Sequence, residues 1–145
     1  MGFFSNKKSK KSYWLKWADG QMKQGLSRWD VAMQLLQSSH ASADELRARL
    51  DAQSDLSNVF LQRNQDGMDL EKQGQIEEAI VLYQTNIAEG FTGQHPYERL
   101  RILYTKQKNY DKAIEICKAY LALPDIAPKK RVKFSRDLEK LKAKQ

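Results

Sequence analysis

Apolar residues recur at helical spacing through the middle of the chain, and one stretch of this pattern occurs twice. Ala79 and Ala113 lie 34 residues apart, and an isoleucine follows each of them. The same offset relates three more pairs, namely Leu70 with Tyr104, Ile80 with Ile114, and Ile87 with Leu121. A period of this length is typical of stacked pairs of antiparallel helices. The pattern therefore predicts two similar helical hairpins in succession.

The boundaries of the four repeat helices follow from breaker and cap residues. A long helix starts near residue 55 and ends at Gly74, and the next one carries the apolar stripe from Ile76 to Ile87. Gly90 is placed to end that helix with a positive φ. Pro96 belongs to the first turn of the third helix, where its missing N–H costs no hydrogen bond. The fourth helix spans about 110–121.

Ahead of the repeat, the sequence predicts a basic, flexible arm over 1–25 and a helix pair over 26–54. Ser27 is placed as the N-cap of the first helix of the pair, and Ser42 with Glu45 forms a capping box for the second. The segment 38–41 joins the two. The apolar positions expected to pack in this pair are Trp29, Met33, Leu36, Leu46 and Leu50.

After the repeat region of 55–123, the sequence predicts a basic capping helix in the segment 124–145. Pro124 and Pro128 prevent the preceding helix from continuing. The last helix spans about 129–143, and its expected core positions are Val132, Phe134, Leu138 and Leu141. Fewer than about three repeats rarely form a stable stack alone, so flanking helices are expected to cap this one.

Composition and length support the same fold class. Helix-forming residues dominate, with only 7 glycines and 3 prolines among 145 residues, and 41% of residues are hydrophobic. This length suits one domain. We expect an all-α fold: a short stack of antiparallel helical hairpins with flanking capping helices.

The stretch from about 60 to 123 resembles two units of the tetratricopeptide repeat family. In that family a small residue in the second helix allows close helix contact, as Ala79 and Ala113 would here. Gly67 matches the glycine of the first helix, and Tyr83 matches an aromatic position of the second. The linker of 90–100 is similar to one found in small bacterial members.

Each of the two units departs from the family pattern at two positions. Arg101 stands where the family prefers glycine, and Cys117 stands where an aromatic residue is usual. Arg63 and Asp66 replace the usual tryptophan and leucine of the first unit.

The resemblance implies a binding function on the concave face that the first helix of each unit lines. That face would bind a protein or peptide partner, or a second copy of the chain, as an adaptor or scaffold does. The residues carried over by position are Asn64, Met68, Glu71, Lys72, Glu98, Ile102, Thr105 and Lys106.

Candidates for chemistry are few. His40 and His95 have no cysteine, serine or acid at a recognisable motif spacing, so both are interpreted as loop or linker residues. Cys117 is the single cysteine, on an apolar helix face, and is expected to be a small buried hydrophobe. We therefore expect a non-catalytic protein with no catalytic, cofactor-binding or metal-binding residues and no cofactor.

Positive charge is concentrated at the two ends of the chain. The formal net charge is +7, made up of +5 over 1–18, +6 over 129–145 and −4 between them. Near the N-terminus the lysines are followed by Tyr13, Trp14 and Trp17, a composition that suits nucleic acid or an anionic membrane surface. The alternative function is thus a nucleic-acid-binding accessory protein that uses its basic termini, or one whose termini contact an anionic membrane. The basic termini could equally serve only to keep the protein soluble. With no signal peptide or spanning segment recognised, we expect a cytoplasmic protein.

Overall fold

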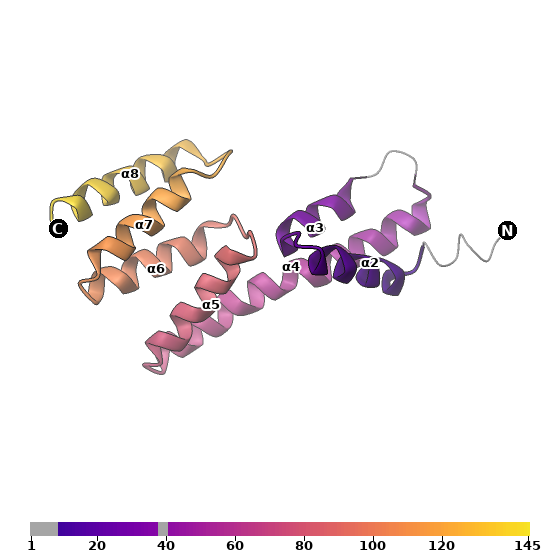
Figure 1. The fold of residues 1–145 in the computed structure, drawn as a ribbon, viewed down its shortest axis with the longest axis horizontal. Helices are drawn as coiled ribbons and strands as arrows, with labels where there is room; N and C mark the ends of the chain where they lie inside the picture. The colour runs from indigo at the N-terminus through magenta and orange to yellow at the C-terminus, as the bar shows by residue number, and fades with distance from the viewer. Residues whose placement is uncertain (1–8, 38–40) are drawn as a thin grey trace. The chain divides into compact units, whose positions relative to one another are not determined.

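The structure, a computed structural model, describes residues 9–37 and 41–145. Every element in these ranges is an α-helix, so the predicted all-α class is confirmed (Figure 1). None of the described helices combines the length and the apolar composition needed to cross a membrane. The expectations for residues 1–8 of the arm and for residues 38–40 of the connecting loop lie outside the described residues.

The helices follow one another with short connections. In chain order they are α2 (Lys11–Lys23), α3 (Arg28–Leu36), α4 (Ala43–Lys72), α5 (Ile76–Ala88), α6 (Gln94–Lys106), α7 (Tyr110–Leu121) and α8 (Pro128–Lys142).

The chain divides into two compact units, whereas its length led us to expect one domain. Unit 1 comprises Met1–Gln62 with Ala88–Phe91, and unit 2 comprises Arg63–Ile87 with Thr92–Gln145. Each unit has a buried apolar cluster of its own, which is why the two are distinct. Helix α4 contributes residues to both units.

In unit 1, part of the predicted flexible arm is helical. Helix α2 packs against α3, and Ala18 is fully buried between them. Trp14 and Trp17 pack against the same cluster, which corrects the expectation of a flexible arm over 1–25 for the residues from Lys11 onward. The physical reason is that these apolar residues share one helix face and are removed from water together. Gly20 lies inside α2, and Gly25, at φ +102°, follows its C-terminal end.

Arg49 of α4 binds the C-terminal end of α3. Its Nε donates a hydrogen bond of 3.0 Å to the carbonyl oxygen of Leu35, and its Nη2 donates one of 3.1 Å to that of Gln34. The guanidinium also lies 4.8 Å from the ring centroid of Trp14. Arg49 thus connects α4 to the C-terminal end of α3, where a cation is favourable, and to Trp14 of α2.

The segment 88–91 closes unit 1 through aromatic contacts. Phe91 stacks on Phe60 with ring centroids 5.1 Å apart, and Trp29 meets Phe91 edge-on at 5.8 Å. The backbone N–H of Trp29 donates to the carbonyl of Glu89 at 3.1 Å. Gly90 has φ +91°, which confirms its predicted conformation at the end of α5.

Two sequence-based expectations for the helix pair are wrong, although its caps are confirmed. Ser27 Oγ accepts from the N–H of Asp30, and Ser42 Oγ accepts from the N–H of Glu45. The second helix does not end near residue 54, because 43–72 contains no proline and continues as α4. The apolar positions Leu36, Leu46 and Leu50 are exposed, whereas α3 buries Val31, Ala32 and Leu35.

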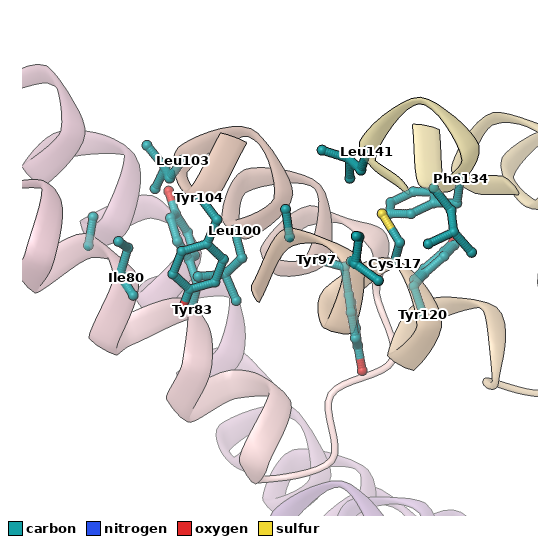
Figure 2. Packing of buried hydrophobic residues seen from close by; sticks show 14 residues of the cluster. Ile80, Tyr83, Tyr97, Leu100, Leu103, Tyr104, Cys117, Tyr120, Phe134 and Leu141 are labelled. Atoms are coloured by element: carbon teal, nitrogen blue, oxygen red, sulfur yellow. The ribbon is translucent and has the colours of Figure 1, made fainter. Parts of the chain in front are cut away.

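Unit 2 is a stack in which α6 packs on α7 and α7 on α8, while α5 packs against the end of α4. Figure 2 shows one cluster of buried side chains running through the stack. Tyr83 of α5 lies beside Leu100 and Tyr104 of α6 (Figure 2). Farther along, the ring of Tyr120 in α7 stacks on Phe134 of α8 with centroids 4.1 Å apart.

The 34-residue offset extends from the side chains to the backbone of the turns. Gly74 ends the first hairpin turn at φ +78°, and Lys108, 34 residues later, has φ +59°. In each turn the third residue after a helix donates to the same carbonyl position: Gln75 to Leu70 at 2.9 Å, and Asn109 to Tyr104 at 2.8 Å. Both hairpins therefore use the same turn, although one has glycine and the other lysine at its left-handed residue.

At the point where its two helices cross, each hairpin pairs one small residue with one large residue, and the two hairpins do so in opposite order. A Cβ atom added to Gly67 would lie 2.6 Å from Cε1 of Tyr83, so the first hairpin admits no side chain there. In the second hairpin Arg101 replaces the glycine and Cys117 replaces the tyrosine. The two departures from the repeat pattern thus compensate in volume, since a large first-helix residue faces a small second-helix one.

Helix α8 covers the last face of the stack. Phe134, Leu138 and Leu141 are buried as predicted, but Val132 is 56% exposed and does not belong to the core. Pro128 occupies the first turn of α8, where it leaves no hydrogen bond unmade.

Candidate functional site

An open pocket of about 470 Å³ lies between the C-terminal end of α4 and α6, within unit 2. We call it the α4–α6 pocket. Its apolar lining comes from Met68 of α4 and Ile102 of α6. Its charged and polar lining consists of Glu71, Lys72, His95, Glu98 and Arg99.

Five of the eight residues predicted for the partner-binding face line this pocket, and three do not. Asn64 is buried and accepts a 2.9 Å hydrogen bond from Asn86 Nδ2, so it belongs to the α4–α5 contact. The hydroxyl of Thr105 donates to the carbonyl of Arg101 at 2.6 Å. Lys106 is exposed at the end of α6 and outside the lining, although its charge acts on Glu71.

The difference between the predicted partner-binding residues and the pocket lining has a simple geometric origin. Equal offsets along the repeat select the same turns of α4 and α6, but the pocket joins the last turns of α4 to the first turns of α6. Residues one turn too early in α4 and one turn too late in α6 therefore fall outside it. His95 and Arg99, which the sequence reasoning did not select, precede Glu98 and Ile102 at i, i+3 spacing.

Glu71 is held in place on the α4 side of the pocket. Tyr83 Oη donates a 2.6 Å hydrogen bond to Glu71 Oε2, and Arg99 Nε donates one of 3.0 Å to the same oxygen. Arg99 Nη2 also donates to Oε1. Burial raises the pKa of Glu71, but the hydrogen bonds from Arg99 and Tyr83 outweigh it and lower the pKa below its ordinary value. The carboxylate is therefore charged and fixed at neutral pH.

Glu98 forms a second network on the α6 side. Its carboxylate accepts from Gln94 Nε2, from Lys133 Nζ of α8, and from Arg101 Nη2 at 3.4 Å. Burial raises the pKa of Glu98, but the bonds from Lys133 and Gln94 prevail, and the pKa is lowered. Arg101 in turn forms an ion pair with Asp137 of α8, with Nε and Oδ2 3.4 Å apart. This chain of charges links the pocket wall to α8.

His95 lines the same pocket, and the charges of both carboxylates act on it. Its ring meets the ring of Tyr83 edge-on, with centroids 5.7 Å apart. Its Nε2 is buried and has no hydrogen-bond partner among the described residues. Burial and the nearby Arg99 lower the pKa of His95, so the imidazole is neutral at pH 7.

Cys117 lies apart from the pocket lining, in the core of the stack. The side chain is fully buried, as predicted, and burial raises the pKa of the thiol to about 11. A protonated, inaccessible thiol is a poor nucleophile and a poor metal ligand.

The charges around the pocket do not balance. Glu71 and Glu98 are each paired with an arginine or a lysine, and further cations lie nearby. The cations in or beside the lining are Lys72, Arg99, Arg101, Lys106 and Lys133. With Asp137, the partner of Arg101, counted as well, five cations surround three carboxylates, so the pocket combines an apolar lining with a positive surrounding charge. Such a surface suits an apolar side chain flanked by negative charge.

Comparison of the chain with protein-family models, with curated proteins and with solved structures gave no match.

Proposed function

We propose that this protein is a non-catalytic, cytoplasmic helical-repeat adaptor that binds a peptide segment of a partner protein in the α4–α6 pocket. The observation that carries the proposal is the convergence of Met68, Lys72 and Ile102 with His95 at one open pocket. These side chains come from the first helices of two successive hairpins. A resemblance to small bacterial tetratricopeptide-repeat proteins supports the same mode of binding.

The ligand we propose is a short acidic segment with a central apolar side chain. The apolar side chain would contact Met68 and Ile102, and Met68 suits this because its unbranched thioether adapts to different shapes. Acidic residues beside it would meet Lys72 and Lys106, for which the structure records no ion pair among the described residues. The two carboxylates of the pocket are already neutralised by their own partners and would not repel the segment strongly.

A display selection tests this proposal. Random 12-residue peptides are selected on the full chain, and the best binder is synthesised and titrated against variants. Met68→Asp and Lys72→Glu should each weaken binding at least tenfold, because one removes apolar contact and the other reverses a charge. We expect the selected sequences to share an apolar residue beside Asp or Glu.

The control variants change the same chemistry away from the pocket. Val81→Asp replaces an exposed apolar residue of α5, and Lys118→Glu reverses an exposed lysine of α7. Both should leave the affinity within twofold of the parent. If no peptide is enriched, or if pocket and control variants bind equally well, the proposed function is wrong.

A further inference from the structure

Helix α8 carries a row of cations along one exposed side. Lys129, Lys133, Arg136 and Lys140 follow one another at i, i+4, i+7 and i+11, so they share one side of the helix. All four are exposed, while Phe134 and its neighbours on the opposite side are buried. We call these four residues the α8 basic row. With a rise of about 1.5 Å per residue, the row is about 16 Å long.

The row contains no acidic residue, and most of it is unpaired. Of the two acids in α8, Asp137 pairs with Arg101 and Glu139 pairs with Lys142. Lys133 pairs with Glu98 at the pocket. Within the ranges 9–37 and 41–145, no ion pair or hydrogen bond is recorded for the side chains of Lys129, Arg136 or Lys140. Three cations thus face solvent in a line.

Helix stability does not account for the cation at the start of the row, Lys129. The first turn of α8 contains cations and no acid, and no side chain caps it. Positive side chains at a helix N-terminus oppose the helix dipole, so a helix selected only for stability would carry acids there. The dipole thus disfavours Lys129 in the first turn, whereas it favours Lys140 in the last turn.

We propose that the α8 basic row binds the phosphate backbone of double-stranded nucleic acid without reading its sequence. Exposed cations gain affinity from a polyphosphate because they release its condensed counterions. A protein partner would instead need buried apolar anchors, and the row offers none. Stacking on single-stranded bases needs exposed aromatic rings, and the aromatic side chain of α8, Phe134, is fully buried. This inference does not depend on peptide binding in the pocket.

Fluorescence anisotropy of a labelled 20-base-pair DNA duplex, titrated with the full chain from 50 to 200 mM KCl, tests the proposal. A triple variant, Lys129→Gln with Arg136→Gln and Lys140→Gln, should weaken binding at least tenfold at 100 mM KCl. Loss of about three phosphate contacts should also make the log–log salt slope shallower by about 2.7. Two duplexes of unrelated sequence should bind equally well, because backbone contacts carry no sequence information.

A matched triple variant on α7 and its preceding turn separates the row from net charge. Lys108→Gln, Lys112→Gln and Lys118→Gln remove the same charge from exposed positions, and we expect a change below twofold. Val132→Ala changes an exposed apolar residue next to the row. It should leave the affinity for the duplex unchanged, because phosphate contacts use no apolar side chain. Circular dichroism should show the same helix content and unfolding midpoint for every variant.

Several results would overturn the proposal. One is the absence of duplex binding at 50 mM KCl, and another is equal weakening by the two triple variants. Tighter binding of a 20-nucleotide single strand than of the duplex would exclude backbone recognition of a double helix. Equal competition by poly-L-glutamate of matched charge would mean that the row binds acidic proteins as well as it binds nucleic acid.

Discussion

Gly67 has no room for a side chain, because the buried ring of Tyr83 lies where its Cβ would be. Tyr83 cannot easily move away, since its hydroxyl is bonded to Glu71. Gly67→Ala should therefore lower the free energy of unfolding by about 1–3 kcal/mol, despite the better helix propensity of alanine. Urea titration followed by circular dichroism measures the change.

Gly20→Ala provides the control for Gly67→Ala. Gly20 is also inside a helix, but an added Cβ would meet no atom within 4 Å. This variant should gain about 0.5–1 kcal/mol from helix propensity alone. Equal effects of the two substitutions would show that Tyr83 does not restrict Gly67.

Glu71 makes stability depend on pH through a pKa that is lowered in the folded state. Its contribution is complete above the ordinary value of 4.5 and is lost as the pH falls below 4.5 through the folded pKa. Glu71→Gln should thus cost about 1–3 kcal/mol at pH 7, because charge-assisted hydrogen bonds are lost. The difference from the parent should shrink as the pH falls below 4.5.

The pH series is read from urea midpoints at several pH values. Glu115→Gln, at an exposed position in the middle of α7, is the control and should change stability little at pH 7. A Glu71→Gln cost that stays constant down to pH 3 would contradict the assignment of the effect to the charged carboxylate.

The two hairpin turns adopt one backbone conformation with different residues at its left-handed position. A side chain with a Cβ costs about 1–2 kcal/mol there, which glycine avoids. Lys108→Gly should therefore stabilise the chain by about 0.5–1 kcal/mol, and Gly74→Ala should destabilise it by about 1 kcal/mol. Thermal unfolding compares the two variants.

Lys118→Gly makes the same substitution at a right-handed helical position in the last turn of α7 and should destabilise by about 1 kcal/mol. A Lys108→Gly variant that loses stability as Lys118→Gly does would mean that the turn is not left-handed in solution.

The separate cores of the two units predict separate local stabilities. Phe134 is fully buried in unit 2, and Leu35 is buried in unit 1. Phe134→Ala should cost about 3–5 kcal/mol and Leu35→Ala about 2–5 kcal/mol, because each leaves a cavity. Hydrogen exchange should lose protection in α6, α7 and α8 for the first variant and in α2 and α3 for the second. Uniform loss across all helices in both variants would show a single cooperative unit.

Most helix positions and caps could be predicted from the sequence, because they depend on residues close together in the chain. Ser27, Gly90 and Pro96 act through local backbone geometry and are found where the pattern placed them. The repeat period also predicted which positions pack in unit 2. It did so because two similar hairpins bury equivalent residues, such as Ala79 and Ala113.

Other features depend on contacts between distant residues, which spacing along one helix does not reveal. Leu36 and Val132 fit an apolar stripe and are nevertheless exposed, because the neighbouring helix covers a different face. The pocket likewise joins different turns of α4 and α6, so Asn64 lies in the core and His95 lies in the lining.

Local sequence chemistry thus specified the helices, their ends and the repeated hairpin. The sequence also showed that positive charge gathers near the ends of the chain. Only the packing of the helices decided that Trp14 and Trp17 join a core, that the chain has two units, and which cations remain unpaired on α8. The reason is that burial and ion pairing are properties of neighbours in space, and these neighbours come from helices far apart in the chain.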